Sequence, residues 1–221
     1  MLSCFTLILL GAQSALGTPN LVSSRDLKSR ATSITVNLDQ TYQTMDGFGF
    51  SQAFGRATDL YNLEGSLRTY ALDLLFNTTT GAGMSILRNR IGSGGTGDSI
   101  EPNSPGSPSA SPTYVWDGSD TNQIWVSQQA QSYGVKNFYA DAWSAPGFMK
   151  TNGNEDNGGY LCGVSGETCS SGDWKQAYAN LIVQYIKDYQ SEGIDINFVG
   201  FLNEPDYTWV LLSVLALLII I

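Results

Sequence analysis

The fold of this chain is decided by residues 173–205, which read DWKQAYANLIVQYIKDYQSEGIDINFVGFLNEP. Between 173 and 192, large apolar side chains recur every three or four positions, the spacing that places them on one face of a helix. They are Trp174, Tyr178, Leu181, Tyr185 and Tyr189. Gly193 then supplies a usual helix stop. Residues 197–203 are a nearly continuous apolar run, typical of a strand in a parallel sheet that is covered on both faces. The stretch predicts one helix–strand unit that ends in Asn203-Glu204-Pro205.

The same alternation of strand and helix signals runs through the preceding residues. Strands are predicted at 34–38, 46–50, 83–91 and 137–143, and helices at 63–76 and 121–133. In the helix at 63–76 we expect the core-facing side chains to be Leu67, Tyr70, Ala71, Leu74 and Leu75. This repetition predicts an α/β fold of parallel β/α units, and four units are half of an eightfold barrel. Residues 92–120 form a loop with four of the seven prolines, and a loop of that length is usually functional or mobile.

Composition excludes several classes of function. The 221 residues include 11 Lys and Arg, 20 Asp and Glu, and no His, for a net charge of −9. Without imidazole there is no Ser-His-Asp or Cys-His catalysis and no His-ligated metal, so we expect no metal site. The negative charge argues against nucleic-acid binding. General acid–base chemistry falls to carboxylates.

The N-terminal residues predict secretion. Residues 1–17 hold an apolar stretch followed by small residues, as in a signal peptide, although a buried N-terminal strand or helix is the alternative. Cleavage there would remove Cys4 and leave Cys162 and Cys169, which we expect to form a disulfide in an oxidising compartment. Asn77 begins the one N-glycosylation sequon, which is usable only in a secreted chain. Residues 18–33 form a polar leader.

The C-terminal residues do not continue the pattern. Residues 209–221 read WVLLSVLALLIII, and thirteen residues are too few to span a bilayer, which takes about 20. We expect this run to be foreign to the fold, as in a truncated or mis-spliced gene model. A buried terminal element and a membrane anchor are the alternatives.

The predicted strands end in groups that can carry chemistry. In a β/α barrel, functional side chains lie where strands end and the following loops begin. Those positions hold Phe50-Ser51-Gln52, Arg88-Asn89-Arg90, Asp141-Ala142-Trp143 and Asn203-Glu204-Pro205. An amide beside a carboxyl is the pair that glycoside hydrolysis uses for a sugar hydroxyl and the leaving oxygen. A surface turn rich in Asp, Glu and Pro is the alternative interpretation of the last segment.

Four segments together resemble glycoside hydrolase family 30, in particular its fungal branch of endo-β-1,6-galactanase-like and xylanase-like enzymes. They are DGFGFSQAFGR (46–56), GMSILRNRIGS (83–93), WSAPGFMKTNG (143–153) and FLNEP (201–205), and the resemblance runs over 34–208. It implies a (β/α)8 TIM barrel, here limited to about the first four units, with the family's side β-sandwich largely absent. It also implies a secreted monomer that hydrolyses β-linked plant cell-wall polysaccharide with retention and without a cofactor.

The resemblance assigns roles to five residues. Glu204 matches the acid/base, and Asn203 matches its neighbour that contacts the sugar. Trp143 matches an aromatic wall, and Arg88 matches a strand-end arginine of the site. For Trp143 and Arg88, a core aromatic and a structural ion pair are the alternatives. Arg56 lies where a guanidinium could bind a uronic-acid branch, although a solvated surface arginine is the ordinary outcome.

The chain departs from the family at the nucleophile. Retaining hydrolysis requires a second carboxylate about 5 Å from the first. The family places it as a Glu at the end of the seventh strand, and residues 34–208 hold no match for it, since Asp46, Asp141 and Asp206 are elsewhere. We therefore expect an inactive fragment. The alternatives from other classes are a non-catalytic carbohydrate-binding protein and a membrane-attached fragment.

Overall fold

The computed structural model describes residues 37, 39–93 and 97–204. The predicted signal peptide (1–17), polar leader (18–33) and apolar run (209–221) lie outside the described residues, as does nearly all of the predicted strand at 34–38. The chain divides into two units, Met1–Thr44 and Met45–Ile221. The described residues of the first unit contain no helix or strand, so the account below concerns the second.

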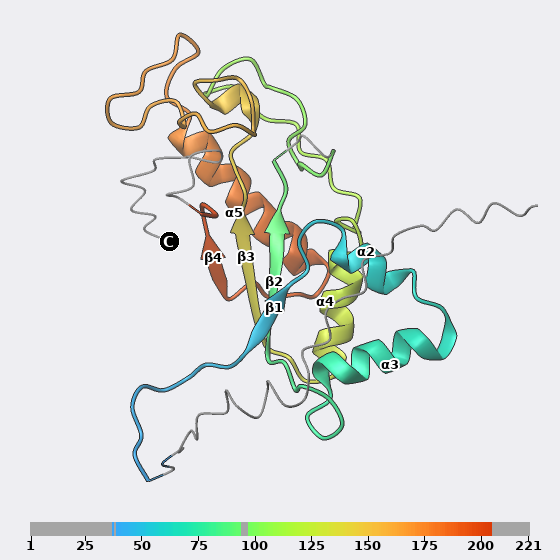
Figure 1. Ribbon diagram of the computed structural model, residues 1–221. Helices are drawn as coiled ribbons and strands as arrows, with labels where there is room; N and C mark the ends of the chain where they lie inside the picture. Colours follow the sequence, from blue (N-terminus) through green and yellow to red (C-terminus); the bar gives the residue numbers. More distant parts are fainter. Residues whose placement is uncertain (1–36, 38, 94–96, 205–221) are drawn as a thin grey trace, which may run out of the picture. The chain divides into compact units, whose positions relative to one another are not determined.

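Four strands form one parallel sheet in the order β1-β2-β3-β4 (Figure 1). They are β1 (Gly49–Ser51), β2 (Ile86–Ile91), β3 (Asn137–Ala142) and β4 (Phe198–Gly200). The helices between them are α2 (Arg56–Tyr61), α3 (Gly65–Phe76), α4 (Gln123–Ser132) and α5 (Lys175–Ser191), with a 3-10 turn at Gly147–Met149. Each strand therefore reaches its neighbour through a helical crossover, which confirms the predicted succession of parallel β/α units.

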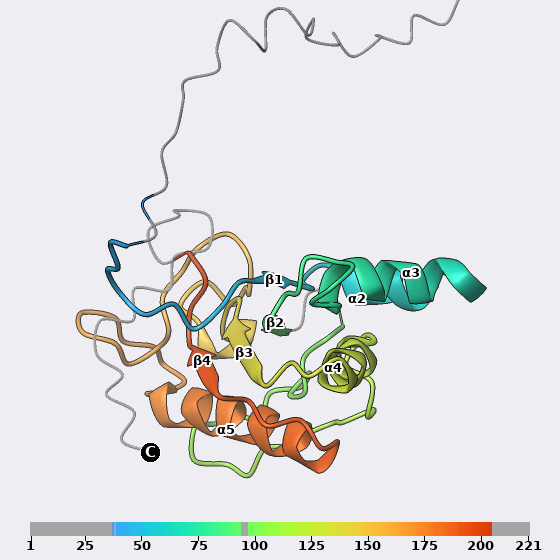
Figure 2. The same cartoon turned by 90° about the horizontal axis from the view of Figure 1, so that it is seen from below.

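The two faces of the sheet have different side chains because successive residues of a strand point to opposite faces. On β2, Leu87, Asn89 and Ile91 are buried, whereas Arg88 and Arg90 are half-buried on the other face. Figure 2 shows α4 and α5 on one side of the sheet. The side chain of Asn89 lies 3.3 Å from the Ser127 hydroxyl of α4, which identifies this as the helix-covered face.

Helix α5 is as the sequence predicts. All five side chains of its predicted apolar face are buried, namely Trp174, Tyr178, Leu181, Tyr185 and Tyr189. Gly193 ends the helix with a φ of 80°, a left-handed conformation that costs glycine little.

The expected face of α3 is wrong. Leu67, Tyr70 and Leu74 are exposed, and the buried side chains are Leu72 and Phe76. Apolar residues occur around much of this helix, so periodicity does not select one face. The face is selected by contact, because the Phe76 ring packs 5.7 Å from the ring of Phe50 on β1.

The expected burial of the last strand is also wrong. Phe198 remains 46% exposed, and Val199 is exposed as well. Within the described residues β4 pairs only with β3, so it forms an edge of the sheet. An apolar run alone does not distinguish an edge strand from a central one. The short helix α2 was not predicted.

The long loop after β2 is held by a buried carboxyl at its end. Oδ2 of Asp120 accepts hydrogen bonds from the hydroxyls of Tyr185 at 2.7 Å and Tyr189 at 2.6 Å, and from the Gln123 amide at 2.8 Å. Burial raises the pKa of Asp120 to about 6, against the opposing effect of these hydrogen bonds. The carboxyl thus joins the loop to α4 and α5.

The predicted disulfide is confirmed. Cys162 and Cys169 are bonded, with their Cα atoms 5.5 Å apart. The bridge lies in the loop between β3 and α5, and the N–H of Trp174 donates to the carbonyl of Cys162 at 2.8 Å. It therefore fixes this loop at the start of α5.

Candidate functional site

Three polar side chains, from β2, from β3 and from the segment that follows β4, meet on the open face of the sheet. The Arg88 guanidinium of β2 pairs with the Asp141 carboxylate of β3. The same Nη2 donates to Oδ1 of Asn203 at 2.5 Å. Asn203 follows β4, and its N–H donates to the carbonyl of Ala142 at 2.9 Å, which continues the pairing of the two strands. The structure therefore brings two of the predicted site residues, Arg88 and Asn203, into direct contact.

The register of the sheet explains this meeting. Tyr139 and Asp141 of β3 are two residues apart, so their side chains share the face that carries Arg88. Trp143 follows directly after β3 and continues this spacing. Gly200 of β4 lies beside Asp141, and a Cβ at this position would collide with the Asp141 carboxylate and the Tyr139 hydroxyl. The glycine therefore makes room for the polar side chains of β3.

The opposite charges of Arg88 and Asp141 compensate each other in a position that is partly shielded from solvent. The Asp141 side chain is 4% exposed and that of Arg88 is 26% exposed. Burial raises the pKa of Asp141, while the Arg88 cation and a hydrogen bond from Tyr139 act in the opposite direction. The Arg88 cation thus stabilises the ionised form of Asp141, which burial alone would disfavour.

Trp143 forms a wall beside the cluster. The guanidinium carbon of Arg88 lies 4.8 Å from the centre of its ring. The ring of Phe54 also meets the Trp143 ring edge to face, with the ring centres 5.0 Å apart and an interplanar angle of 83°. Trp143 is half-buried. It contacts the predicted strand-end arginine, and part of its surface stays open to solvent.

Glu204 follows Asn203 directly and is exposed. Its φ is 50°, in the left-handed region that non-glycine residues seldom adopt and that concentrates at functional sites. Glu204 therefore lies in the segment after the carboxyl end of β4, next in sequence to the Asn203 that Arg88 contacts, and it is accessible to a molecule from solvent.

The structure does not bring Arg56 into this cluster. It begins α2 and forms an ion pair with Asp59 at 2.9 Å, in which both side chains are exposed. Asn77 caps the C-terminal end of α3, and its Oδ1 accepts the N–H of Thr79 at 2.8 Å. Neither residue contacts Arg88, Asn203 or Trp143 in any interaction recorded for the described residues.

Sequence reasoning placed Arg90 and Asp141 at strand ends without giving either a role, and it missed the contacts of Tyr139 and Phe54. Two-residue alternation was the signal available for Tyr139 and Asp141, because it places both on the same face as Trp143. Phe54 carried no such signal. It lies in the loop after β1 and has a left-handed φ of 56°, which nothing in the sequence around it predicts.

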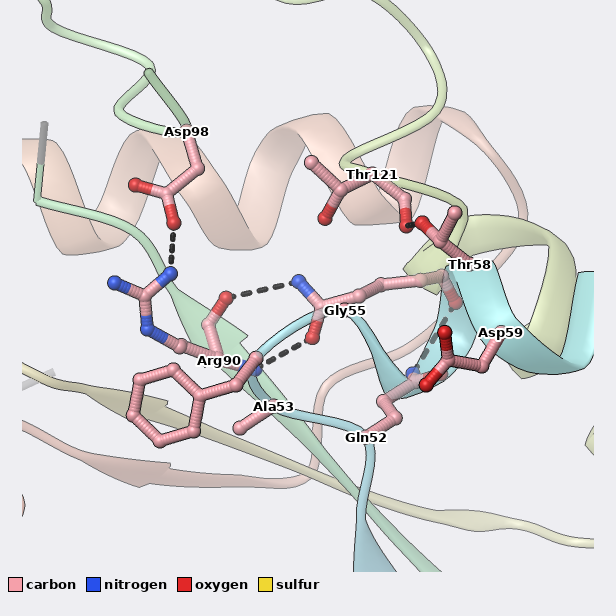
Figure 3. Close-up of a pocket in the computed structure, with 10 residues that line it drawn as sticks. Gln52, Ala53, Gly55, Thr58, Asp59, Arg90, Asp98 and Thr121 are labelled. Atoms are coloured by element: carbon pink, nitrogen blue, oxygen red, sulfur yellow. Dashed lines mark hydrogen bonds and ion pairs between the residues drawn. The ribbon is translucent and has the colours of Figure 1, made fainter. Parts of the chain in front are cut away.

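A pocket of about 480 Å³ opens beside the cluster, between the loop after β1 and the end of β2 (Figure 3). Arg90 and Phe54 line it and also contact Trp143, which links the pocket to the Arg88 cluster. Arg90 pairs with Asp98 in its wall. Burial lowers the pKa of Arg90 from its usual value.

Two negative observations apply to residues 37, 39–93 and 97–204. No three His, Cys, Asp or Glu side chains there are arranged to hold a metal ion. No helix among these residues is long and apolar enough to cross a bilayer.

Comparison with known proteins identifies a matching family and several similar proteins. The family model described as O-Glycosyl hydrolase family 30 matches residues 31–214. The chain is 29% identical over 176 residues to an endo-1,6-β-D-glucanase of Trichoderma harzianum, a match that covers 74% of this chain and 34% of that protein. An endo-1,6-β-D-glucanase of Aspergillus fumigatus is 30% identical over 177 residues, with 74% and 35% covered.

A solved structure adds the fold. The catalytic domain of the family 30 xylanase C from Talaromyces cellulolyticus is 62% identical and matches with a TM-score of 0.75, over 80% of this chain and 40% of that chain. The four-stranded parallel sheet is thus the first part of the TIM barrel of these enzymes. The chain spans about a third of the length of the two glucanases and 40% of the xylanase chain. By its matched residues, its strand order and these relatives, the chain belongs to glycoside hydrolase family 30.

Proposed function

We propose that residues 34–208 are the acid/base half of a secreted, retaining endo-glycoside hydrolase that acts on β-linked plant cell-wall polysaccharide. The single observation that carries this proposal is the position of Glu204. Glu204 is exposed in the segment that follows β4, next in sequence to an asparagine that the Arg88–Asp141 pair holds in place.

The geometry supports a division of roles. Glu204 donates a proton to the glycosidic oxygen as the bond breaks, and later removes a proton from the attacking water. Because Oδ1 of Asn203 accepts from Arg88, its Nδ2 amide is the group left to donate to a sugar hydroxyl. Trp143 offers an aromatic surface to a sugar ring beside them.

The second carboxylate is not supplied by residues 34–208. Asp141, the buried carboxylate of the cluster, is engaged by Arg88 and Tyr139 and does not occupy the place of the family's nucleophile. A retaining mechanism places its nucleophile about 5 Å from the acid/base. We infer that the 221-residue chain alone has no turnover and that a later strand of the barrel must provide this group.

Xylan is the substrate class that the relatives favour. The chain is 62% identical to a xylanase and 29–30% identical to two β-1,6-glucanases. Arg56 is proposed to contact a uronic-acid branch, since its pair with Asp59 is exposed and a pair of that kind is worth about 0.2–1 kcal/mol. A β-1,6-linked galactan or glucan is the second candidate.

Secretion is supported by the disulfide. Cys162 and Cys169 are bonded, as suits an oxidising compartment, and residues 1–17 have the pattern of a signal peptide. Glycosylation at Asn77 and a monomeric state are part of the same proposal.

A chimera tests the proposal. Residues 34–204 replace the matching segment of the xylanase C catalytic domain, which then supplies the remaining strands and the nucleophile. We expect reducing-sugar release from xylan at a rate at least ten times that from β-1,6-galactan or β-1,6-glucan. A folded chimera that binds xylan without releasing sugar would support the non-catalytic carbohydrate-binding alternative.

A further inference from the structure

The loop between β2 and α4 packs on α5 next to buried carboxyl groups that form no ion pair. Its described residues, 97–120, contain no helix or strand (Figure 1). Glu101 and Asp120 belong to this loop and are 1% and 7% exposed, and Asp188 of α5 is 9% exposed. None of the three forms an ion pair within the described part of the chain. Fully buried Asp and Glu side chains are rare unless they are paired, so three unpaired ones at one contact are unusual.

Glu101 is the most enclosed of these groups. Its Oε2 has no hydrogen-bond partner among the described residues, and neither does Oδ2 of Asp188. Both carboxyls act electrostatically on the Tyr114 hydroxyl of the loop, which places them on the same part of the contact with α5. Burial raises the pKa of Glu101 to about 7 and also raises the pKa of Asp188. In such a position the protonated carboxyl is favoured over the ionised one.

Asp120 joins the end of the loop to α5. Its Oδ2 accepts from the hydroxyls of Tyr185 and Tyr189, at 2.7 and 2.6 Å. In the same loop the indole N–H of Trp116 donates to Oε1 of Glu192, the residue that caps α5, at 3.1 Å. The hydroxyl hydrogen bonds favour the ionised form of Asp120, yet burial outweighs them and raises its pKa to about 6. The contact of loop and helix is therefore weakened when Asp120 loses its proton.

The other charged groups that face these carboxyls do not neutralise them. They come from the loop itself, from β2, from the segment after β3 and from the end of α5, namely Asp98, Asp117, Arg90, Glu155 and Glu192. Arg90 is the one cation in this set, and it is already paired with Asp98. Lys150 acts on Glu155 and donates to its carbonyl oxygen at 2.8 Å. Ionisation of Glu101 and Asp120 therefore adds negative charge to a contact that is already acidic.

We propose that residues 97–120 are a pH-sensitive flap, which stays on α5 while Glu101 and Asp120 are protonated and leaves it when both have lost their protons to solvent. Because both pKa values are raised in the folded protein, the stabilisation is full below about pH 4 and is lost as the pH rises through 6 and 7. The flap reaches the candidate site, since its Asp98 pairs with Arg90, whose guanidinium carbon lies 5.7 Å from the centre of the Trp143 ring. The inference involves no substrate and stands apart from the proposed function.

Hydrogen–deuterium exchange of the 221-residue chain at pH 5 and pH 8 tests the flap, after correction for the intrinsic exchange rate at each pH. The reporter is the amide of Val115, which donates to the Ile100 carbonyl at 2.7 Å within the flap. The raised pKa of Asp120 alone changes the opening equilibrium about tenfold between these pH values, so the protection of Val115 should fall at least about tenfold at pH 8. At pH 8 it should also lie at least about tenfold below the protection of the β3 amides, which exchange when the sheet unfolds.

Glu101→Gln combined with Asp120→Asn removes both ionisations and keeps the shape of the side chains. In this double variant we expect the protection of Val115 to change at most about threefold between pH 5 and pH 8. Asp195→Asn is the matched control, because it removes an exposed carboxyl outside the flap and should leave the tenfold fall intact.

The same exchange experiment on the chimera, which holds the flap in a complete barrel, makes the test independent of the stability of the shorter chain. Protection of Val115 that is equal at the two pH values, or equal to that of β3 at pH 8, overturns the flap. A tenfold fall that persists in the double variant overturns the assignment to Glu101 and Asp120.

Discussion

The buried carboxyl of Asp120 should make the stability of this chain depend on pH. Oδ2 accepts from Tyr185, Tyr189 and Gln123, and burial raises the pKa of Asp120 to about 6 from an ordinary value of 3.8. The folded protein therefore binds this proton more tightly than the unfolded chain does. The contribution to stability is fully present below about pH 4 and is lost as the pH rises through 6.

The size of the effect follows from the shift. A difference of 6 − 3.8 = 2.2 pKa units, at about 1.36 kcal/mol per unit, gives about 3 kcal/mol. Asp120→Asn keeps the shape and an acceptor oxygen but never ionises. At pH 4 the variant should have about the same free energy of unfolding as the unsubstituted chain. At pH 8 it should be more stable by up to about 3 kcal/mol.

The assay is urea unfolding followed by tryptophan fluorescence at several values between about pH 4 and pH 8, at constant ionic strength. Glu101 is also buried and has a pKa raised to about 7, so both proteins will show some dependence on pH. The difference between their curves isolates Asp120. An Asp120→Asn chain that is less stable than the unsubstituted chain at pH 8 would refute the reasoning.

Three further predictions concern the cluster, the disulfide and the surface arginine. Arg88→Met should destabilise the chain by about 3 kcal/mol because it leaves Asp141 buried without its cation, and adding Asp141→Asn should restore most of that loss in a double-mutant cycle of unfolding free energies. Additive losses would show that the two residues do not interact. Replacing Cys162 and Cys169 by serine should lower the free energy of unfolding by about 2.5 kcal/mol, measured in urea against the oxidised chain, and no change would contradict the structural role of the bridge. In the chimera, Arg56→Ala should lower kcat/KM on glucuronoxylan about tenfold relative to undecorated xylan; an unchanged ratio of the two rates removes Arg56 from the substrate contacts.

Local patterns in the sequence predicted the elements that carry strong and unambiguous signals. The apolar positions of α5 lie on one stripe, so its buried face from Trp174 to Tyr189 is as expected. Strand ends were located well enough to single out Arg88 and Asn203, which meet in the structure. The pairing of Cys162 with Cys169 follows from the count that remains after cleavage of a signal peptide, and it is confirmed.

What could not be predicted depends on contacts between distant residues. The face of α3 is selected by the meeting of Phe50 and Phe76, which no periodicity contains. The partner of Arg88 is Asp141, fifty-three residues away, and the register between β2 and β3 decides that contact. The left-handed backbone of Phe54 could not be predicted either, because phenylalanine seldom adopts this conformation.

The central claim is that Glu204 is the acid/base of a family 30 hydrolase. Its most direct test is Glu204→Ala in the chimera, assayed on xylan and on an aryl β-xyloside with a good leaving group, with and without azide. Loss of the acid/base should lower the rate of xylan hydrolysis at least about 10³-fold. The rate on the activated glycoside should fall much less, because its leaving group does not need a proton. Azide, which needs no general base, should restore turnover and give a β-xylosyl azide. Activity on xylan within tenfold of the parent chimera, or loss that azide does not rescue, would contradict the claim.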